Sequence, residues 1–218
     1  SSLLLAVAHR VCAGGATALT AISESFPEVE RRNTRKIAAE IGAPLIEFNT
    51  NELNDPFYVL NEGDRCYFCR RALFDRAELS IHAENLGELC YGAIFEDDPT
   101  DRPGMKAAQE FTVNAPLVSS GLLKAEIRLL AKMYGLSNWN KPAAPCLASR
   151  FPVGTPVTAK GLAQIEMLEN ALHELGFQVA RARYFESNVV IELPILDLGR
   201  VQSSDNLMQK ITRAARRA

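Results

Sequence analysis

Hydrophobic and polar positions in the first two thirds of the chain alternate between the period of a helix and that of a strand. The spacing is helical over residues 1–12, 28–41, 68–86 and 124–134, and short apolar runs of strand length occupy residues 16–22, 45–48 and 88–92. Strands that alternate with helices of about a dozen residues are typical of βαβ units. The pattern therefore predicts an α/β fold, with helices on both faces of a parallel sheet.

The pattern changes at a proline-rich stretch, residues 141–156, which we predict to be a long loop. After it come an amphipathic helix over residues 158–175, two strands over 177–184 and 189–193, and a basic helix over 205–217. We therefore expect two domains. The first is an α/β domain over residues 1–145, and the second is a smaller α+β domain over residues 146–218.

The composition narrows the class of protein. The 218 residues are 47% hydrophobic and carry a net charge of −2, without the basic excess usual in a nucleic-acid-binding protein. No apolar run approaches the ~20 residues of a membrane span, and the pattern of a signal peptide is missing. We expect a cytoplasmic protein that binds neither nucleic acid nor membrane and that forms a homo-oligomer.

The cysteines are the sharpest chemical signal. Five of them, an odd number thinly spread, favour a reduced compartment and metal-binding or catalytic thiols over disulfides. Cys66 and Cys69 are three residues apart where a helix is predicted to begin, and such a pair suits a metal or cluster site, a redox dithiol, or a partly buried pair without function. Cys12 and Cys90 lie in apolar segments, and we expect both to be inert core residues.

Cys146 is the candidate for a third ligand, because it lies in the proline-rich loop and is followed by Ser149 and Arg150, a setting that suits a reactive thiolate. Three thiolates with one open position are typical of a [4Fe–4S] cluster, whereas zinc would need a fourth protein ligand. His82 or His173 could supply it, although a lone histidine in a helix is more often a surface or core residue.

Three further groups are candidates for ligand contacts. Arg181 and Arg183 share one face of a predicted strand, about 6.6 Å apart, which suits a phosphate or an exposed edge. Glu192 has apolar neighbours, so it is functional, paired or turned to solvent. Asp97, Asp98 and Arg102 follow the end of a predicted strand, where open α/β sheets bind ligands and where a solvated turn is the alternative.

These stretches together resemble the LarE-type ATP-dependent sulfur transferases, a branch of the PP-loop superfamily with a Rossmann-like sheet. The matching segments are residues 65–69 (RCYFC), 97–98 (DD), 101–104 (DRPG), 122–128 (LLKAEIR), 139–150 (WNKPAAPCLASR) and 154–158 (GTPVT). The likeness covers nearly the whole chain, and the segment around Cys146 is specific to the family. Ser1 and Ser2 resemble the residues that follow the aspartate of the family's ATP loop, so we expect a strand and loop upstream of Ser1.

The resemblance implies a reaction and a set of roles. Such a protein uses ATP with Mg²⁺ to adenylate the carboxylate of a pyridinium mononucleotide and then delivers sulfur, which makes the thiocarboxylate of the nickel-pincer nucleotide cofactor. Ser1, Ser23, Ser25, Asp97, Asp98, Arg102, Ser149 and Arg150 would bind the nucleotides, Arg181 and Arg183 would hold the mononucleotide phosphate, and Glu192 would be a base or metal contact.

Family members differ in the source of sulfur. In one kind the thiol matching Cys146 is sacrificed, and in the other Cys66, Cys69 and Cys146 hold a [4Fe–4S] cluster that accepts sulfide or takes sulfur from a donor. Because all three cysteines are present, we favour the cluster kind. Two alternatives are a PP-loop tRNA thiolase, which a pI near 6 disfavours, and a non-catalytic binding module stabilised by zinc.

Overall fold

The computed structural model of the chain describes residues 1–13, 15–97, 102–186 and 188–218. Its contacts divide these residues into two compact units. Unit 1 comprises Ser1–Ser23, Glu28–Tyr58 and Asp64–Ala144, and unit 2 comprises Glu24–Pro27, Val59–Gly63 and Pro145–Ala218. The segments 24–27 and 59–63, which the sequence analysis placed in the first domain, therefore pack with the second.

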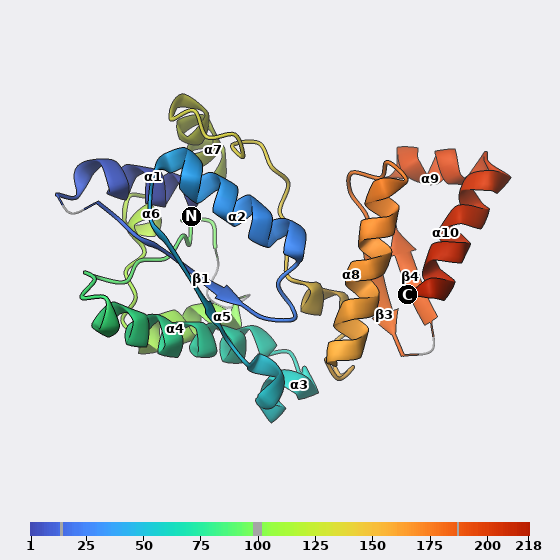
Figure 1. Cartoon of the computed structure of the whole chain (residues 1–218), viewed down its shortest axis with the longest axis horizontal. Helices are drawn as coiled ribbons and strands as arrows, with labels where there is room; N and C mark the ends of the chain where they lie inside the picture. The colour runs from blue at the N-terminus through green and yellow to red at the C-terminus, as the bar shows by residue number, and fades with distance from the viewer. Residues whose placement is uncertain (14, 98–101, 187) are drawn as a thin grey trace. The chain divides into compact units, whose positions relative to one another are not determined.

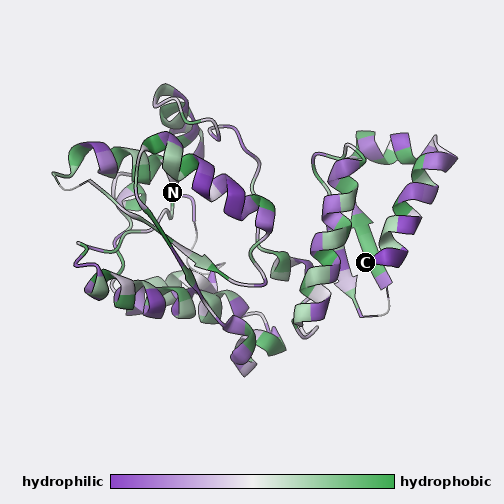
Figure 2. Cartoon of the chain, viewed as in Figure 1, coloured by the Kyte–Doolittle hydropathy of each residue, from purple (hydrophilic) through white to green (hydrophobic). Residues whose placement is uncertain are grey.

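Unit 1 is a mixed α/β structure around a two-stranded parallel sheet. Strand β1 (Ala18–Ile22) pairs in parallel with β2 (Leu45–Asn49), and helix α2 (Glu28–Ile41) connects them, as the βαβ pattern predicts. In Figure 1, α1 (Ser2–Val11) and α2 lie on one side of these strands and α4 (Arg65–Ala83) lies on the other. Hydrophilic residues dominate α2 in Figure 2, which fits its exposed outer face.

The remaining helices of unit 1 are short. They are η1 (Glu52–Asn54), α5 (Pro103–Glu110), α6 (Pro116–Ser119), α7 (Lys124–Met133) and α3 (Pro56–Leu60), whose last two residues belong to unit 2. Of these helices the sequence pattern predicts only α7. Pro103 and Pro116 occupy the first helical positions, where a missing N–H costs nothing and the fixed φ angle favours the helix.

The strand predicted over residues 88–92 is wrong. Only Cys90 forms a β-bridge there, to Asn114, and the backbone hydrogen bonds around it join Tyr91 and Leu89 to the same residue. The partner segment is confined between α5 and α6, so it is too short for a ladder. The parallel sheet in the described part of the chain thus has two strands, and a larger PP-loop sheet stays a prediction.

Unit 2 is built on one long helix and an antiparallel hairpin. Helix α8 (Ala159–Glu174) packs against β3 (Arg181–Phe185), which pairs with β4 (Asn188–Glu192); α9 (Ile195–Gln202) and α10 (Asp205–Arg217) follow. Thr158 caps α8 by accepting a hydrogen bond from the backbone N–H of Gly161. Figure 2 shows β4 as a largely hydrophobic strand. The predicted long helix, the two strands and the basic helix are present, although β3 begins four residues later than predicted. The 3-10 helix at Leu147–Arg150, inside the predicted loop, and α9 were not predicted.

Candidate functional site

The loop that carries Cys146 is held by its own backbone and by an early segment of the chain. Cys146 precedes the 3-10 helix η2 (Leu147–Arg150), and the Ser149 hydroxyl donates a 2.7 Å hydrogen bond to the Cys146 carbonyl. The N–H of Leu147 donates to the carbonyl of Ser25 at 2.8 Å, and Ser25 is itself buried. A buried leucine and two backbone anchors thereby fix the position of the Cys146 main chain.

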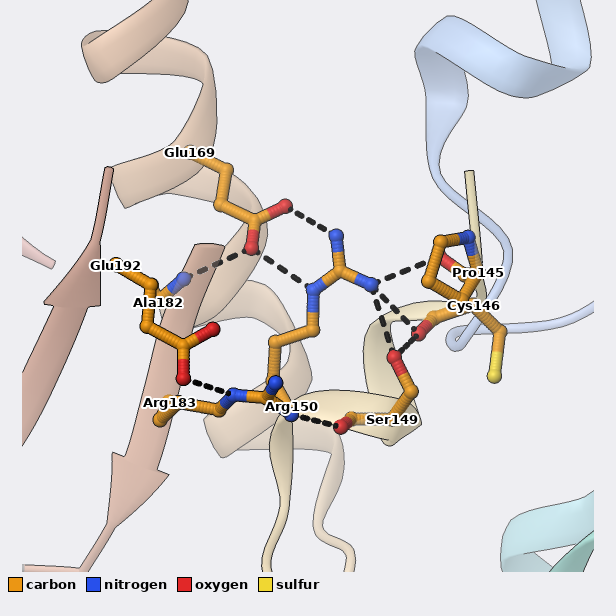
Figure 3. Close-up of polar contacts among 8 residues, drawn as sticks. All are labelled: Pro145, Cys146, Ser149, Arg150, Glu169, Ala182, Arg183 and Glu192. Atoms are coloured by element: carbon orange, nitrogen blue, oxygen red, sulfur yellow. Dashed lines mark hydrogen bonds and ion pairs between the residues drawn. The ribbon is translucent and has the colours of Figure 1, made fainter. Parts of the chain in front are cut away.

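Arg150 connects this loop to helix α8 through a buried ion pair. Its Nε and Nη2 atoms donate to the two carboxylate oxygens of Glu169 at 2.8 and 2.9 Å, and both residues are 6% exposed. Its Nη1 atom donates to the carbonyls of Pro145 and Cys146 and to the Ser149 hydroxyl. The same Glu169 carboxylate accepts the N–H of Ala182 at 2.9 Å, so one carboxylate ties the loop to α8 and to β3 (Figure 3).

A second arginine contacts the loop from the exposed side of the hairpin. Arg183 donates from Nη1 to the Ser149 carbonyl at 3.0 Å and from Nε to Glu192 at 3.0 Å. Arg181 and Arg183 lie on the same face of β3, and Ala182 between them is buried on the other face. Glu192 is the register partner of Arg181. The predicted shared face is confirmed, and Glu192 is a paired, half-exposed carboxylate.

Positive charge exceeds negative charge around the hairpin and the Cys146 loop. The hydrogen bond from Arg183 lowers the pKa of Glu192, and the positive charges of Arg183, Arg181 and Arg150 add to that effect. Glu192 is therefore an anion at neutral pH, and the three arginines Arg150, Arg181 and Arg183 face two carboxylates, Glu169 and Glu192. In Figure 3 the sulfur of Cys146 points away from Arg150 and Glu169, so the buried network holds the main chain of the loop and leaves the thiol outside it.

The other two cysteines of the candidate site belong to unit 1. Helix α4 begins at Arg65, three residues earlier than expected, so Cys66 and Cys69 lie within its first two turns. Cys66 is exposed and Cys69 is partly buried. The Cys69 thiol donates a hydrogen bond to Oε1 of Glu52 at 3.6 Å. Among the described residues, no three His, Cys, Asp or Glu side chains already surround a common metal position, and both His82 and His173 are exposed on their helices.

The expectation that Cys12 and Cys90 are core residues is wrong, since both are exposed. Cys12 directly follows the last residue of α1, and Cys90 lies in the segment that does not form a strand, so neither side chain is enclosed by regular structure. Partial burial raises the pKa of the Cys90 thiol, and the nearby Glu88 and Cys12 add to the rise. A raised pKa disfavours the thiolate, the form that binds metal.

The acidic segment after residue 92 lies beside the first residue of the chain. A side chain at Gly92 would come within 2.7 Å of the Ser1 Cα atom, which explains why a glycine occupies that position. Asp97 accepts the N–H of Ile94 and forms an ion pair with Arg102 at 2.9 Å. Asp98, the other acidic candidate, lies outside the described residues. Ser23 directly follows β1 and belongs to the same unit as Ser1 and Asp97.

Sequence reasoning missed two carboxylates, Glu169 and Glu52. Glu169 could have been found, because it shares the apolar face of α8 with Ile165 and Leu172, where a carboxylate needs a partner. Glu52 gave no such signal, since it lies in a polar stretch between β2 and α3 and its burial arises only from tertiary packing.

The relatives of the chain identify its family. It is 35% identical over 194 residues to uncharacterized protein slr1717 of Synechocystis sp., which covers 89% of this chain and 72% of that protein. It is 33% identical over 184 residues to the pyridinium-3,5-bisthiocarboxylic acid mononucleotide synthase of Lactiplantibacillus plantarum, the LarE protein. The chain belongs to the LarE-like family.

The LarE-like match extends over 84% of this chain and 66% of the L. plantarum enzyme. A third relative, uncharacterized protein MJ0830 of Methanocaldococcus jannaschii, is 26% identical over 155 residues, 71% of this chain and 61% of that protein. No protein-family model matches the chain. No helix in the described ranges has both the length and the apolar character that crossing a membrane requires.

Proposed function

We propose that this LarE-like protein is an ATP-dependent sulfur transferase that converts a carboxylate of a pyridinium mononucleotide into a thiocarboxylate, in the biosynthesis of the nickel-pincer nucleotide cofactor. The observation that carries the proposal is the 33% identity to the L. plantarum synthase over 84% of the chain. The geometry of unit 2 supports it, because Arg183, which shares a strand face with Arg181, donates a hydrogen bond directly to the cysteine loop.

The reaction has two steps. First, a carboxylate oxygen attacks the α-phosphorus of ATP, with Mg²⁺ bound to the phosphates, and pyrophosphate leaves to give an acyl-adenylate. Second, a sulfur nucleophile attacks the activated carbonyl carbon and AMP leaves with the former carboxylate oxygen. Adenylation is required because an oxide is a poor leaving group, whereas AMP is a good one.

The residues of unit 2 take the substrate roles. Arg181 and Arg183 bind the phosphate of the mononucleotide through charge-assisted hydrogen bonds, and Glu192 keeps Arg183 in place or accepts a proton. Ser149 lies beside the same phosphate. Every guanidinium nitrogen of Arg150 donates to Glu169 or to the loop, so Arg150 acts by positioning Cys146. For ATP, the proposed contacts are Ser1, Ser23, Ser25, Asp97, Asp98 and Arg102.

In this proposal the transferred sulfur is a sulfide carried by a [4Fe–4S] cluster. The donor set suits it chemically: two thiols in the first turns of one helix and a third in a positively charged loop are the soft ligands that iron–sulfur clusters use. Cys66, Cys69 and Cys146 would hold the cluster, which when bound supplies one open iron for an extra sulfide. Glu52 and the first turns of α4 would keep Cys69 oriented toward it.

The test is a reaction in an anaerobic chamber. Protein purified under strict anaerobiosis is mixed with ATP, Mg²⁺, sulfide and the dicarboxylated pyridinium mononucleotide, and products are separated by mass. The proposal expects AMP and pyrophosphate in equal amounts and a product heavier by ~16 Da for each oxygen replaced by sulfur. If pyrophosphate is released with no such product, the protein adenylates its substrate but does not transfer sulfur to it. Sulfur incorporation into tRNA in place of the mononucleotide would favour a thiolase.

A further inference from the structure

A pocket in unit 1 lies where three helices end. Helix α1 ends at Val11, α2 at Ile41 and α7 at Met133, and α1 contacts both of the others (Figure 1). The pocket has a volume of about 320 Å³, at the small end of the ~300–1,000 Å³ range of ligand pockets. It therefore suits a metabolite of the size of an amino acid and not a nucleotide.

The floor of the pocket is apolar and firmly packed. Ala6 and Leu136 line the pocket and are buried members of a hydrophobic core of unit 1. Ile41 and Tyr134 also line the pocket, and both pack against the same core. A ligand with an apolar side chain would gain affinity here, because it would remove water from this surface.

Two exposed groups of opposite charge line the same pocket. The Arg10 guanidinium lies over the ring of Tyr134, 4.7 Å from its centroid, and this contact restrains a long side chain. Glu40 accepts hydrogen bonds of 2.7 Å from both the hydroxyl and the N–H of Ser137, and these bonds lower the pKa of Glu40. The guanidinium cation and the carboxylate anion are therefore each held in place by an uncharged residue.

Arg10 and Glu40 do not neutralise each other. No ion pair of either residue is found in the ranges of the chain that the structure describes. Opposite charges that share a pocket without pairing leave a place for a ligand that carries both charges. The C-terminal ends of the three helices add partial negative charge at the pocket, which favours the cationic group of such a ligand.

We propose that this pocket binds a free α-amino acid with an apolar side chain. The ammonium group of the ligand donates to Glu40, and its carboxylate accepts from Arg10. Its side chain covers the apolar floor. An α-amino acid fits because both of its charges are attached to one carbon atom, so they reach the two unpaired groups of a small pocket together. The site uses no residue of the proposed sulfur transfer and goes beyond that function.

The experiment measures binding of L-leucine to the 218-residue chain by calorimetric titration, with neither ATP nor the mononucleotide present. Two analogues of L-leucine each lack one charge: 4-methylpentanoate has no ammonium group, and 3-methylbutylamine has no carboxylate. Glycine keeps both charges and lacks the side chain. We expect one L-leucine per chain, bound at least about tenfold more tightly than either analogue or glycine, because each of these loses one of the three contacts.

Two variants assign the charged contacts. Glu40→Gln should weaken binding of L-leucine and of the amine about 3–10-fold and leave that of the acid unchanged. Arg10→Gln should weaken binding of L-leucine and of the acid and leave that of the amine unchanged. Glu28→Gln and Arg32→Gln are the matched controls, since they remove the same charges from exposed positions of α2 outside the pocket, and both should bind L-leucine as wild type does.

Three results would overturn the inference. The first is the absence of saturable binding of L-leucine up to about 10 mM. The second is an equal loss of affinity in the pocket variants and the controls, which would indicate a general effect of charge. The third is binding of glycine or of the amine as tight as that of L-leucine, which would mean that the pocket does not select an apolar amino acid. None of these results bears on the proposed sulfur transfer, whose substrates are absent from the titration.

Discussion

Arg150 and Glu169 form a buried, bidentate ion pair that joins the Cys146 loop to helix α8. Each of the three guanidinium nitrogens of Arg150 donates a hydrogen bond, since Nη1 donates to the carbonyls of Pro145 and Cys146. The position of the Cys146 main chain is therefore set by a carboxylate on a different element. The consequence for stability can be measured.

We expect Glu169→Gln to lower the free energy of unfolding by about 3–5 kcal/mol, because it leaves the Arg150 charge buried without its counter-ion. Urea denaturation followed by circular dichroism measures the change. Glu174→Gln, at the exposed end of the same helix, should change stability by less than about 0.5 kcal/mol. A loss under about 1 kcal/mol in Glu169→Gln would mean that water reaches the guanidinium and that the pair is not sealed.

Arg181→Ala and Arg183→Ala should weaken binding of the mononucleotide about 10–100-fold, because each removes a charge-assisted hydrogen bond to its phosphate. Binding of ATP should change little, since the proposed ATP contacts are mostly in unit 1. Calorimetric titration of both ligands makes the comparison. Arg200→Ala is the control, as this arginine of unit 2 is already paired with Asp197. Equal losses of affinity for the two ligands would indicate that the two arginines stabilise the fold and do not bind the phosphate.

A third expectation concerns pH. Hydrogen bonds from Arg35 and Arg31 lower the pKa of Glu47 in β2 to about 2, from an ordinary value of 4.5. The charged form is favoured in the folded state, so the contribution to stability is complete above about pH 4.5 and is lost as the pH falls toward 2. Glu47→Gln should therefore lower the urea midpoint at pH 7, and the difference from wild type should shrink between pH 5 and pH 3. A difference that stays constant over that range would assign the effect to packing.

The helices and strands with a strong hydrophobic periodicity could be predicted from the sequence. Helix α2 begins and ends at the predicted residues, and β1, β2, α8 and α10 are confirmed within a few positions. The failure at residues 88–92 has a physical origin: apolar residues give a strand only when a neighbouring segment is long enough to pair, and sequence pattern carries no information about the neighbour.

In the candidate site, too, local features could be predicted from the sequence and long-range contacts could not. Arg181 and Arg183 share a face because a strand repeats every two residues, which any strand must do. The partners of Arg150 and Cys69 could not be predicted, since Glu169 and Glu52 approach them across 19 and 17 positions of the chain. Burial of Cys12 and Cys90 was predicted wrongly, because apolar neighbours in sequence do not enclose a side chain at the end of a helix or in a single bridge.

The iron content tests the proposed cluster. Anaerobically reconstituted protein should hold about four irons and four acid-labile sulfides per chain, and Cys66→Ala, Cys69→Ala and Cys146→Ala should each lose the sulfide and the visible absorption, because a cubane needs all three protein ligands. Cys12→Ala and Cys90→Ala are the controls and should keep both. A colourless protein that retains zinc through three cysteines would support the binding module in place of the transferase.

The fate of Cys146 separates the two sulfur mechanisms. If the thiol is sacrificed, its carbon–sulfur bond breaks when the sulfur leaves with the product, and the peptide that contains Cys146 becomes lighter by ~34 Da, the mass of H₂S, with one sulfur transferred per chain. If Cys146 is a cluster ligand, the transferred atom is an added sulfide, and turnover continues for as long as sulfide is supplied.

We expect Cys146 to remain intact after many turnovers under strict anaerobiosis. The reason is the presence of Cys66 and Cys69 in the first turns of α4, which a sacrificial thiol on a separate loop would not require. Tryptic digestion and mass spectrometry after a timed reaction measure the ratio of cysteine to dehydroalanine at residue 146. Dehydroalanine in an amount equal to the thiocarboxylate formed would contradict the cluster mechanism, and the pair at Cys66 and Cys69 would then need a separate explanation.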